Sequence, residues 1–163
     1  MKLDIVHLMK TLLIVLSAKY LIVLSVLIAI FFLFRMRSSP HLLKQAAIMG
    51  SIILMLTYVA AKIAKLFYFD PRPFVVGNFA PLIPHIADNG FPSDHTLLAA
   101  AIAAIVTKYN WRLGIILWIL ALLTGTARVL AGVHHTIDIL GSLIIAGTVA
   151  WIAFKIAGKR IHI

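Results

Sequence analysis

The 163-residue sequence contains no cysteine, no glutamate and only five aspartates. Without cysteine, the chain is not one of the small secreted domains that disulfides hold together. Only 12% of its residues are charged and 63% are hydrophobic, whereas soluble domains are about 25% charged and about 45–50% apolar. The composition is typical of a membrane protein, and the length predicts one domain over residues 1–163.

Basic residues outnumber acidic ones by 15 to 5, which gives a formal net charge of +10. An excess of this kind raises the question of nucleic-acid binding. The cations stand singly or in pairs between apolar blocks and form no basic stripe. The sequence therefore predicts no nucleic-acid partner, and the expected partners are the bilayer and a membrane lipid.

Five uncharged stretches are apolar all round, which indicates helices that face lipid and each other. They are Tyr20–Phe34, Gln45–Ala61, His95–Thr107, Leu113–Ala127 and Ile139–Phe154. Each has roughly 13–17 residues, or about 20–25 Å of helix. Because the hydrocarbon core is roughly 30 Å thick, the flanking residues must extend them. The sequence predicts an all-α polytopic transmembrane bundle with five spans.

The stretch Asp4–Ala18 precedes the first span and is apolar apart from His7 and Lys10. It could lengthen the first span, with Lys19 reaching the interface, or lie as an interfacial helix. We favour the interfacial helix. No small-residue cleavage site follows the stretch, so it does not resemble a cleavable signal peptide.

The basic residues divide between the two membrane faces when five spans alternate. One face receives Arg35, Arg37, Lys44, Lys108, Arg112, Lys155, Lys159 and Arg160. The other receives Lys2, Lys10, Lys19, Lys62, Lys65, Arg72 and Arg128. If Lys65, Arg72 and Arg128 serve chemistry, the comparison becomes eight against four. The positive-inside rule then predicts that the first set is cytoplasmic and the chemistry faces outward.

Candidate functional residues occupy the ends of these spans. The segment Phe67–Pro92 holds five of the six prolines and is long enough to be a functional loop. The candidates are Lys65 after the second span, Arg72 in the loop, Ser93, Asp94 and His95 before or in the third span, Arg128 after the fourth, and His134 and Asp138 before the fifth. Because the spans alternate in direction, we expect all of these ends on one side.

Three cations and two helix N-termini in one place favour a phosphate ligand. A metal held by His and Asp is the competing interpretation. The charges of Lys65, Arg72 and Arg128 would repel a divalent cation, and no His-Glu-x-x-His pattern occurs. We therefore expect an anion and predict no metal and no cofactor.

The histidines suit phosphoryl transfer through a phosphohistidine. His134 and Asp138 are four residues apart, so they share a helix face and can form a hydrogen bond. The carboxylate would orient His134 as a nucleophile. His95 would protonate the leaving oxygen and then deprotonate water.

Three separated motifs resemble those of the type 2 phosphatidic-acid-phosphatase superfamily. Lys65 through Arg72-Pro73 fits Lys, six residues, Arg-Pro; Pro92-Ser93-Asp94-His95 fits Pro-Ser-x-His; Arg128, His134 and Asp138 fit Ser-Arg, five residues, His, three residues, Asp. The resemblance implies a helix bundle with the site at its outer end. It also implies that His134, His95 and Asp138 are catalytic. The phosphate ligands would be Lys65, Arg72, Ser93 and Arg128, with Asp94 and Pro73 as further candidates.

Two positions depart from the family pattern. Ala127 stands where Ser is usual, so we expect modestly weaker phosphate binding. Asp94 stands where Gly is common; it could contact a cation, repel a wrongly charged substrate or cap a helix.

The residues around the motifs, Asp70–Phe74 and Pro84–His95, are similar in sequence to those of bacterial undecaprenyl-diphosphate phosphatases of the bacitracin-resistance type. Those enzymes carry Asp in the second motif. This resemblance implies an isoprenyl diphosphate substrate on the outer face of the cytoplasmic membrane. The alternatives are a glycerolipid or lipid A phosphatase, and an inactive phospholipid-binding or transport protein.

For three further polar residues we expect roles other than catalysis or substrate contact. His135 adjoins His134 but points about 100° away around a helix, which favours packing. For His85 and Asp88 in the proline-rich loop, we expect solvated positions rather than substrate contact.

Overall fold

The computed structural model describes residues 2–159; Arg160 and the side chains of Lys2 and Lys159 lie outside the described part. Within it the chain is all-α, as predicted. The elements are α1 (Lys2–Arg35), a 3-10 helix (Met36–Ser38), α2 (Pro40–Phe67), α3 (Pro73–Val76), α4 (Asp94–Tyr109), α5 (Trp111–Leu130) and α6 (Thr136–Lys159).

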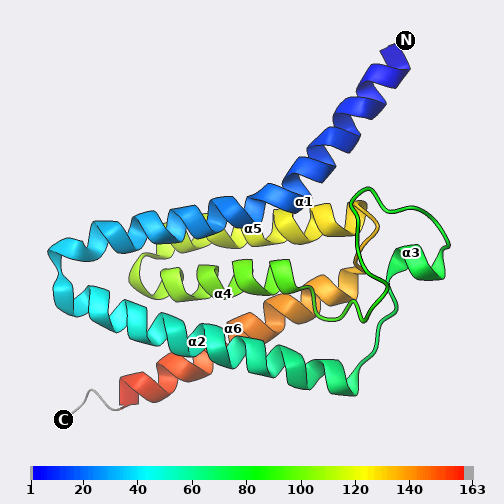
Figure 1. Cartoon of the computed structure of the whole chain (residues 1–163). Coiled ribbons are helices and arrows are strands. Elements are labelled where there is room, and N and C mark those ends of the chain that lie inside the picture. Colours follow the sequence, from blue (N-terminus) through cyan, green and yellow to red (C-terminus); the bar gives the residue numbers. More distant parts are fainter. Residues whose placement is uncertain (1, 160–163) are drawn as a thin grey trace.

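Helix α4 lies in the middle of the bundle and packs against α1, α2, α5 and α6 (Figure 1). Its buried residues include Ala99, Ala100, Ala101 and Ala103. Small side chains let neighbouring helix backbones approach closely, which explains why an alanine-rich helix takes the central position.

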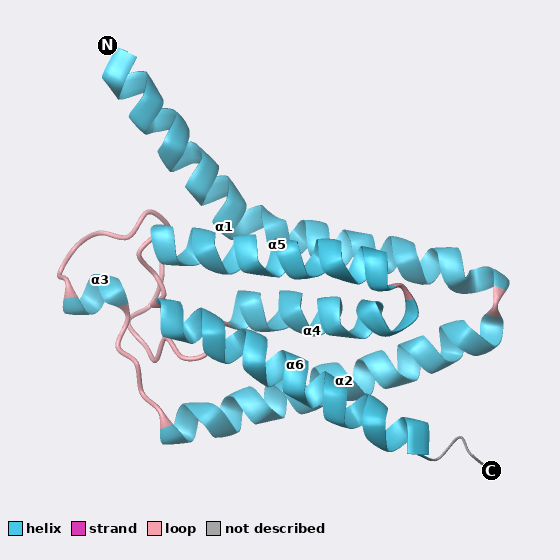
Figure 2. Cartoon of the chain, turned by 180° about the vertical axis from the view of Figure 1, so that it is seen from behind, coloured by secondary structure: helices cyan, strands magenta, loops and turns pink. Residues whose placement is uncertain are grey.

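The connections between helices separate into two ends. Short turns join α1 to α2 and α4 to α5 at one end (Figures 1 and 2). The long connection from α2 through α3 to α4 and the connection from α5 to α6 lie together at the other end. We call this second end the loop end of the bundle.

Helix α1 is continuous over 34 residues, so the stretch Asp4–Ala18 is not a separate helix. It forms the first half of α1 and diverges from the bundle (Figure 1). No Pro or Gly interrupts Lys2–Arg35, and its aliphatic residues tolerate a helix throughout. The arrangement corresponds to the alternative in which this stretch lengthens the first span.

Four helical segments are long and apolar enough to cross a membrane: Asp4–Ser38, Pro40–Phe67, Trp111–Leu130 and Thr136–Gly158. They carry many exposed large apolar side chains, among them Phe31, Met55, Ile119 and Ile144. Helix α4, which contains the third predicted span, has 16 residues, or about 24 Å. Helix α4 is therefore shorter than the hydrocarbon core is thick; its N-cap is Ser93 and its C-cap is Asn110.

Candidate phosphate site

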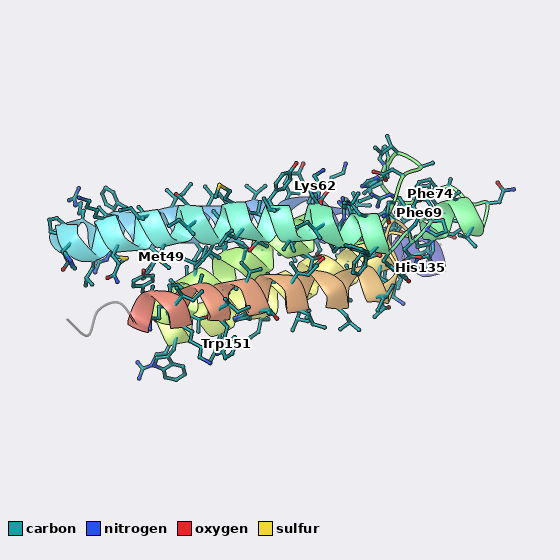
Figure 3. All side chains as sticks on the ribbon, turned by 90° about the horizontal axis from the view of Figure 1, so that it is seen from below. Met49, Lys62, Phe69, Phe74, His135 and Trp151 are labelled. Atoms are coloured by element: carbon teal, nitrogen blue, oxygen red, sulfur yellow. The ribbon has the colours of Figure 1, made fainter. Side chains whose placement is uncertain are left out.

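The loop end of the bundle holds the polar residues singled out from the sequence. Lys65 lies in the last turn of α2, Arg72 precedes α3, and Asp94 and His95 open α4. Arg128 lies in the last turn of α5, and Asp138 lies in the first turn of α6. Figure 3 shows His135 at this end with Phe69 and Phe74, while Met49 and Trp151 lie towards the opposite end.

His134 and Asp138 form a buried pair. His134 Nδ1 lies 3.0 Å from Asp138 Oδ2, and the two side chains are 2% and 0% exposed. The same carboxylate oxygen accepts the backbone N–H of His135 at 2.9 Å. A carboxylate acceptor at Nδ1 fixes the proton there and leaves the lone pair of a neutral ring on Nε2.

The side chain of Arg72 faces that lone pair. Its Nη1 lies 3.3 Å from His134 Nε2 and donates to the carbonyl of Val133 at 2.8 Å. Its Nε donates to Asp88 Oδ1 at 2.6 Å. These three contacts hold a guanidinium that is only 5% exposed against the nitrogen suited to nucleophilic attack.

The imidazole of His134 is kept neutral by its surroundings. Burial lowers the pKa of His134 below its ordinary value of 6.5, and the charges of Arg72 and Arg128 add to this effect. The hydrogen bond to Asp138 opposes it. A neutral ring retains the lone pair that attack on phosphorus requires.

Arg128 is a buried cation that lacks a complete set of partners. The residue is 4% exposed, and its Nε has no hydrogen-bond partner within residues 2–159. Ionised groups in protein interiors are costly unless they are paired. An anion bound between Arg128 and Arg72 would supply the missing partner.

Lys65 and Asp94 form an ion pair at the exposed rim of the site, with Lys65 Nζ 3.3 Å from Asp94 Oδ1. Asp94 is the first residue of α4 and does not cap it, because the N-cap is Ser93. Of the three roles considered for Asp94, the structure shows contact with a cation.

Ser93 ties α4 to α6. Its backbone N–H donates to the carbonyl of Asp138 at 3.3 Å, and Ser142 Oγ contacts the carbonyls of Ser93 and Asp138 at 3.0 and 2.7 Å. The Ser93 hydroxyl accepts a hydrogen bond from Thr96 at 3.2 Å. These bonds set the start of α4, and with it His95, against the start of α6.

His95 and Pro73 complete the set of residues expected from the sequence. His95 is partly buried, and its ring forms no hydrogen bond with any residue from 2 to 159. Pro73 is the first residue of α3, where its ring suits the start of a helix. The structure therefore leaves His95 available to a ligand and gives Pro73 a backbone role.

Asn89 connects the parts of the long loop, although no pattern in the sequence predicts this role. Its Oδ1 accepts the backbone N–H groups of Asp70 and Phe91, each at 3.0 Å. Its Nδ2 donates to the carbonyls of Tyr68 and Lys65 at 2.9 and 3.4 Å. A loop amide has no periodicity, so only the tertiary contacts identify it.

A second acid–histidine pair lies behind the first. His135 Nδ1 is 2.9 Å from Asp70 Oδ2. Both histidines precede α6, so the expected separation around a helix does not apply, and His135 has a polar partner rather than the expected packing role. Burial and the neighbouring Asp138 raise the pKa of Asp70 above its ordinary value, while His135 opposes the rise. Gly90 makes this crowding feasible, because a Cβ there would lie 2.9 Å from Asp138 Oδ2.

A small cation could be held by Asp70, His135 and Asp138, whose ligand atoms lie within 4.8 Å of one another. His135 Nδ1 contacts Asp70 Oδ2, and Asp138 Oδ2 contacts His134. Asp138 Oδ1 is buried and has no hydrogen-bond partner within residues 2–159. The prediction of a metal-independent site stays a prediction.

The expectation of solvated positions for His85 and Asp88 is met only in part: the Asp88 side chain is 45% exposed, but both residues lie close to groups of the phosphate site. Asp88 pairs with Arg72; burial alone would raise the pKa of Asp88, but the Arg72 contact lowers it below its usual value. The ring centroid of His85 lies 6.1 Å from that of His134. The reason is that Leu82 N–H donates to the carbonyl of Ala131 at 3.0 Å, which holds the loop against the bundle.

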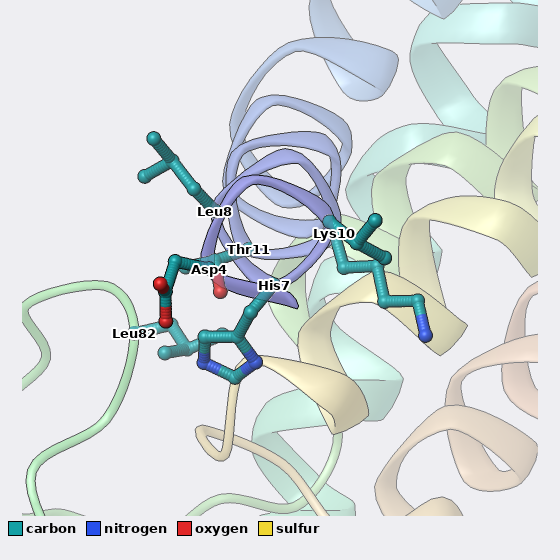
Figure 4. A pocket seen from close by; sticks show the side chains of 7 residues that line it. Asp4, His7, Leu8, Lys10, Thr11 and Leu82 are labelled. Atoms are coloured by element: carbon teal, nitrogen blue, oxygen red, sulfur yellow. The ribbon is translucent and has the colours of Figure 1, made fainter. Parts of the chain in front are cut away.

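A separate hollow of about 980 Å³ lies between the N-terminal turns of α1 and Leu82 (Figure 4). Asp4, His7, Lys10 and Thr11 line it with apolar neighbours. It contains none of the phosphate-site residues, so we place the chemistry in the buried cluster around His134 instead.

Comparisons with known proteins found similar sequences and a similar fold. A sequence model of the PAP2 superfamily matches residues 45–162. The chain is 40% identical over 130 residues to undecaprenyl-diphosphatase BcrC of Bacillus subtilis strain 168, covering 80% of this chain and 65% of that protein. It is 29% identical to the bacitracin transport permease protein BcrC of Bacillus licheniformis, covering 66% of this chain and 54% of that protein. These matches thus span about half to two thirds of the relatives' own lengths.

A solved structure has a similar fold. The crystal structure of Aquifex aeolicus LpxE superposes with a TM-score of 0.71 at 28% sequence identity. The match covers 90% of this chain and 86% of that one. The similarity therefore extends well beyond the three short motifs.

Proposed function

The chain belongs to the PAP2 superfamily, and from this premise we propose that it is an integral membrane lipid phosphatase. Its substrate would be an isoprenyl diphosphate, from which it removes the terminal phosphate. The printed name of the Bacillus subtilis relative, undecaprenyl-diphosphatase, supports undecaprenyl diphosphate as substrate and undecaprenyl phosphate as product.

One observation carries the proposal. Nε2 of His134 faces Arg72 at 3.3 Å, and the charge of the incompletely paired Arg128 acts on the same ring. A phosphoryl group bound by the two guanidinium groups would sit next to that lone pair. Arginine suits such a site because its planar donors match phosphate oxygens in pairs.

The first half of the reaction transfers the phosphoryl group to the protein. The lone pair of His134 Nε2 forms a bond to the terminal phosphorus while the bond from that phosphorus to the bridging oxygen breaks, and His95 gives that oxygen its proton. Asp138 stabilises the positive charge on the His134 ring. Arg72, Arg128 and Lys65 stabilise the charge on the transferring group.

The second half restores the resting site. His95, now neutral, takes a proton from water, and the water oxygen forms a bond to phosphorus as the phosphorus–nitrogen bond breaks. Inorganic phosphate leaves, and His134 is again neutral at Nε2. Each step uses side chains that the loop end of the bundle already holds together.

We further propose a multi-pass topology in which α4 is the fifth crossing, enclosed by the four long helices. The end opposite the site carries Arg35, Arg37, Lys44, Lys108, Arg112 and Lys155, which supports a cytoplasmic position for that end. The site would then face outward, and residues 1–163 would act as one phosphatase domain.

The topology can be tested because the sequence has no cysteine. A single cysteine at Asn78, in the exposed loop, should react with an impermeant thiol reagent in intact cells. A cysteine at Ser38, exposed at the opposite end, should be protected. The reverse pattern would overturn the orientation.

The activity is tested by phosphate release from three lipids under one set of conditions: an isoprenyl diphosphate, phosphatidic acid and phosphatidylglycerol phosphate. We expect the diphosphate to be the best substrate and His134→Ala to abolish its hydrolysis. As a control, His41→Ala changes an exposed histidine at the start of α2 and should leave the rate unaltered. Binding of lipid without turnover would favour the transport interpretation that the Bacillus licheniformis name suggests.

A further inference from the structure

His85 lies in the connection between α3 and α4, which is attached to the bundle on both sides of it. Leu82 N–H donates to the carbonyl of Ala131 at 3.0 Å, and Ile83 is 3% exposed in a core cluster. On the other side, Asp88 pairs with Arg72 at 2.6 Å. The segment is therefore fixed to the elements that carry the phosphate site.

The ring of His85 lies beside the nucleophile. Its centroid is 6.1 Å from that of His134, with the ring planes at 78°. Its Nδ1 has one contact, at 3.4 Å from the carbonyl of Ile86, and its Nε2 has no hydrogen-bond partner among residues 2–159. Burial and the charge of Arg72 lower the pKa of His85, so the neutral ring carries one N–H. With the proton on Nε2, the ring gives up the long Nδ1 contact with Ile86 and can donate to a ligand.

The two histidines differ in depth. His134 is 2% exposed and lies at the floor of the site with Arg128 at 4%, whereas His85 is only partly buried. In phosphoryl transfer the attacking and leaving oxygens or nitrogens lie roughly in line with phosphorus. The leaving group therefore points from His134 towards the solvent-accessible side of the site, where His85 lies.

Hydrolysis of a monophosphate requires no contact from His85. His134 and His95 already perform both steps, and Lys65, Arg72 and Arg128 already surround one phosphoryl group. A diphosphate brings a second phosphoryl group with further acceptor oxygens at the position of the leaving group. An N–H donor reaches such an oxygen at about 2.9 Å.

We propose that His85 donates a hydrogen bond to the phosphoryl group that stays on the lipid, and so selects diphosphates over monophosphates. This inference rests on the proposed function and adds a specificity-determining residue to it. Asp88 has a positioning role, because it holds both the His85 segment and Arg72.

The test compares farnesyl diphosphate and farnesyl monophosphate, which share one lipid tail, with the purified full chain. We expect His85→Ala to lower kcat/KM about 10- to 100-fold on the diphosphate, and by a much smaller factor on the monophosphate. His85→Gln keeps an N–H donor and should recover part of the loss. Ile86→Ala, at a neighbouring side chain that is 69% exposed, should leave both rates as they are.

The outcomes separate the two proposals. Wild-type hydrolysis of farnesyl diphosphate supports the proposed function whatever the variants do, and its absence refutes both proposals. An equal fall on the two substrates in His85→Ala, without recovery in His85→Gln, would show that His85 only supports the fold. No fall on the diphosphate would exclude contact with substrate.

Discussion

The buried guanidinium of Arg128 offers a way to separate stability from function. It is 4% exposed, and its Nε lacks a partner among residues 2–159. Replacing buried ionic groups by apolar residues of similar volume is often neutral or stabilising by about 1–4 kcal/mol. We therefore expect Arg128→Met to raise the free energy of unfolding by about 1–3 kcal/mol.

The same change should impair catalysis. Arg128 is one of the groups proposed to stabilise charge on the transferring phosphoryl group, and loss of one such donor costs about 10²–10³ in rate. Arg128→Met should therefore lower kcat/KM by this factor. Arg112→Met, which removes an exposed cation from the other end of α5, should change neither property substantially.

The assay combines thermal unfolding with ligand binding. Orthovanadate at 100 times its Kd should stabilise the wild-type chain by about 2.7 kcal/mol, and much less stabilisation is expected in Arg128→Met. A less stable variant would show that the folded chain compensates the charge of Arg128 by contacts absent from this account. An unchanged kcat/KM would remove Arg128 from the phosphate site.

Three further perturbations act on the nucleophile and its support. Asp138→Asn should lower kcat by about 10³–10⁴, because an amide can donate to His134 Nδ1 and move the ring proton to the attacking nitrogen; steady-state kinetics and imidazole NMR measure both effects. Gly90→Ala places a Cβ 2.9 Å from Asp138 Oδ2 and should lower kcat about 10- to 100-fold. Stability should fall from about pH 7.5 to about pH 6. The pKa values of His134 and His85 are lowered in the folded chain, so the unfolded chain binds more protons in this range.

Each of these expectations has a control or a contrary result. Gly158→Ala, where a Cβ would meet nothing within 4 Å, should leave kcat as it is. A loss of less than about tenfold in Asp138→Asn would show that the carboxylate does not set the tautomer of His134. A melting temperature that stays constant or rises on acidification would contradict the lowered pKa values. The fall should be smaller in His134→Asn.

Much of the site could be predicted because its residues lie at the ends of apolar blocks. Helices that alternate in direction bring every second end to the same face, so the sequence predicts that Lys65, Arg128 and His134 lie on one side. The spacing of His134 and Asp138 predicted their hydrogen bond, but the expected shared helix face is wrong. His134 precedes α6, and Asp138 in its first turn reaches back to it.

The remaining features depend on contacts that leave no pattern in the sequence. Asn89 and His85 owe their positions to single hydrogen bonds and one buried side chain in an irregular loop. The sequence also could not show that α1 is one continuous helix, because a lysine at position 19 is compatible with a helix break or with an uninterrupted helix. The length of α4, which ends at Tyr109, also leaves no clear pattern in the sequence.

In the proposed mechanism His134 receives the phosphoryl group, and trapping the intermediate tests this step. Isoprenyl diphosphate labelled in its terminal phosphate is mixed with the chain, quenched in base during the first turnover, and the protein is digested and mapped by mass spectrometry. We expect acid-labile, base-stable label on His134 that disappears in His134→Ala. Label on a different residue, or complete turnover with no labelled protein at any time, would contradict it.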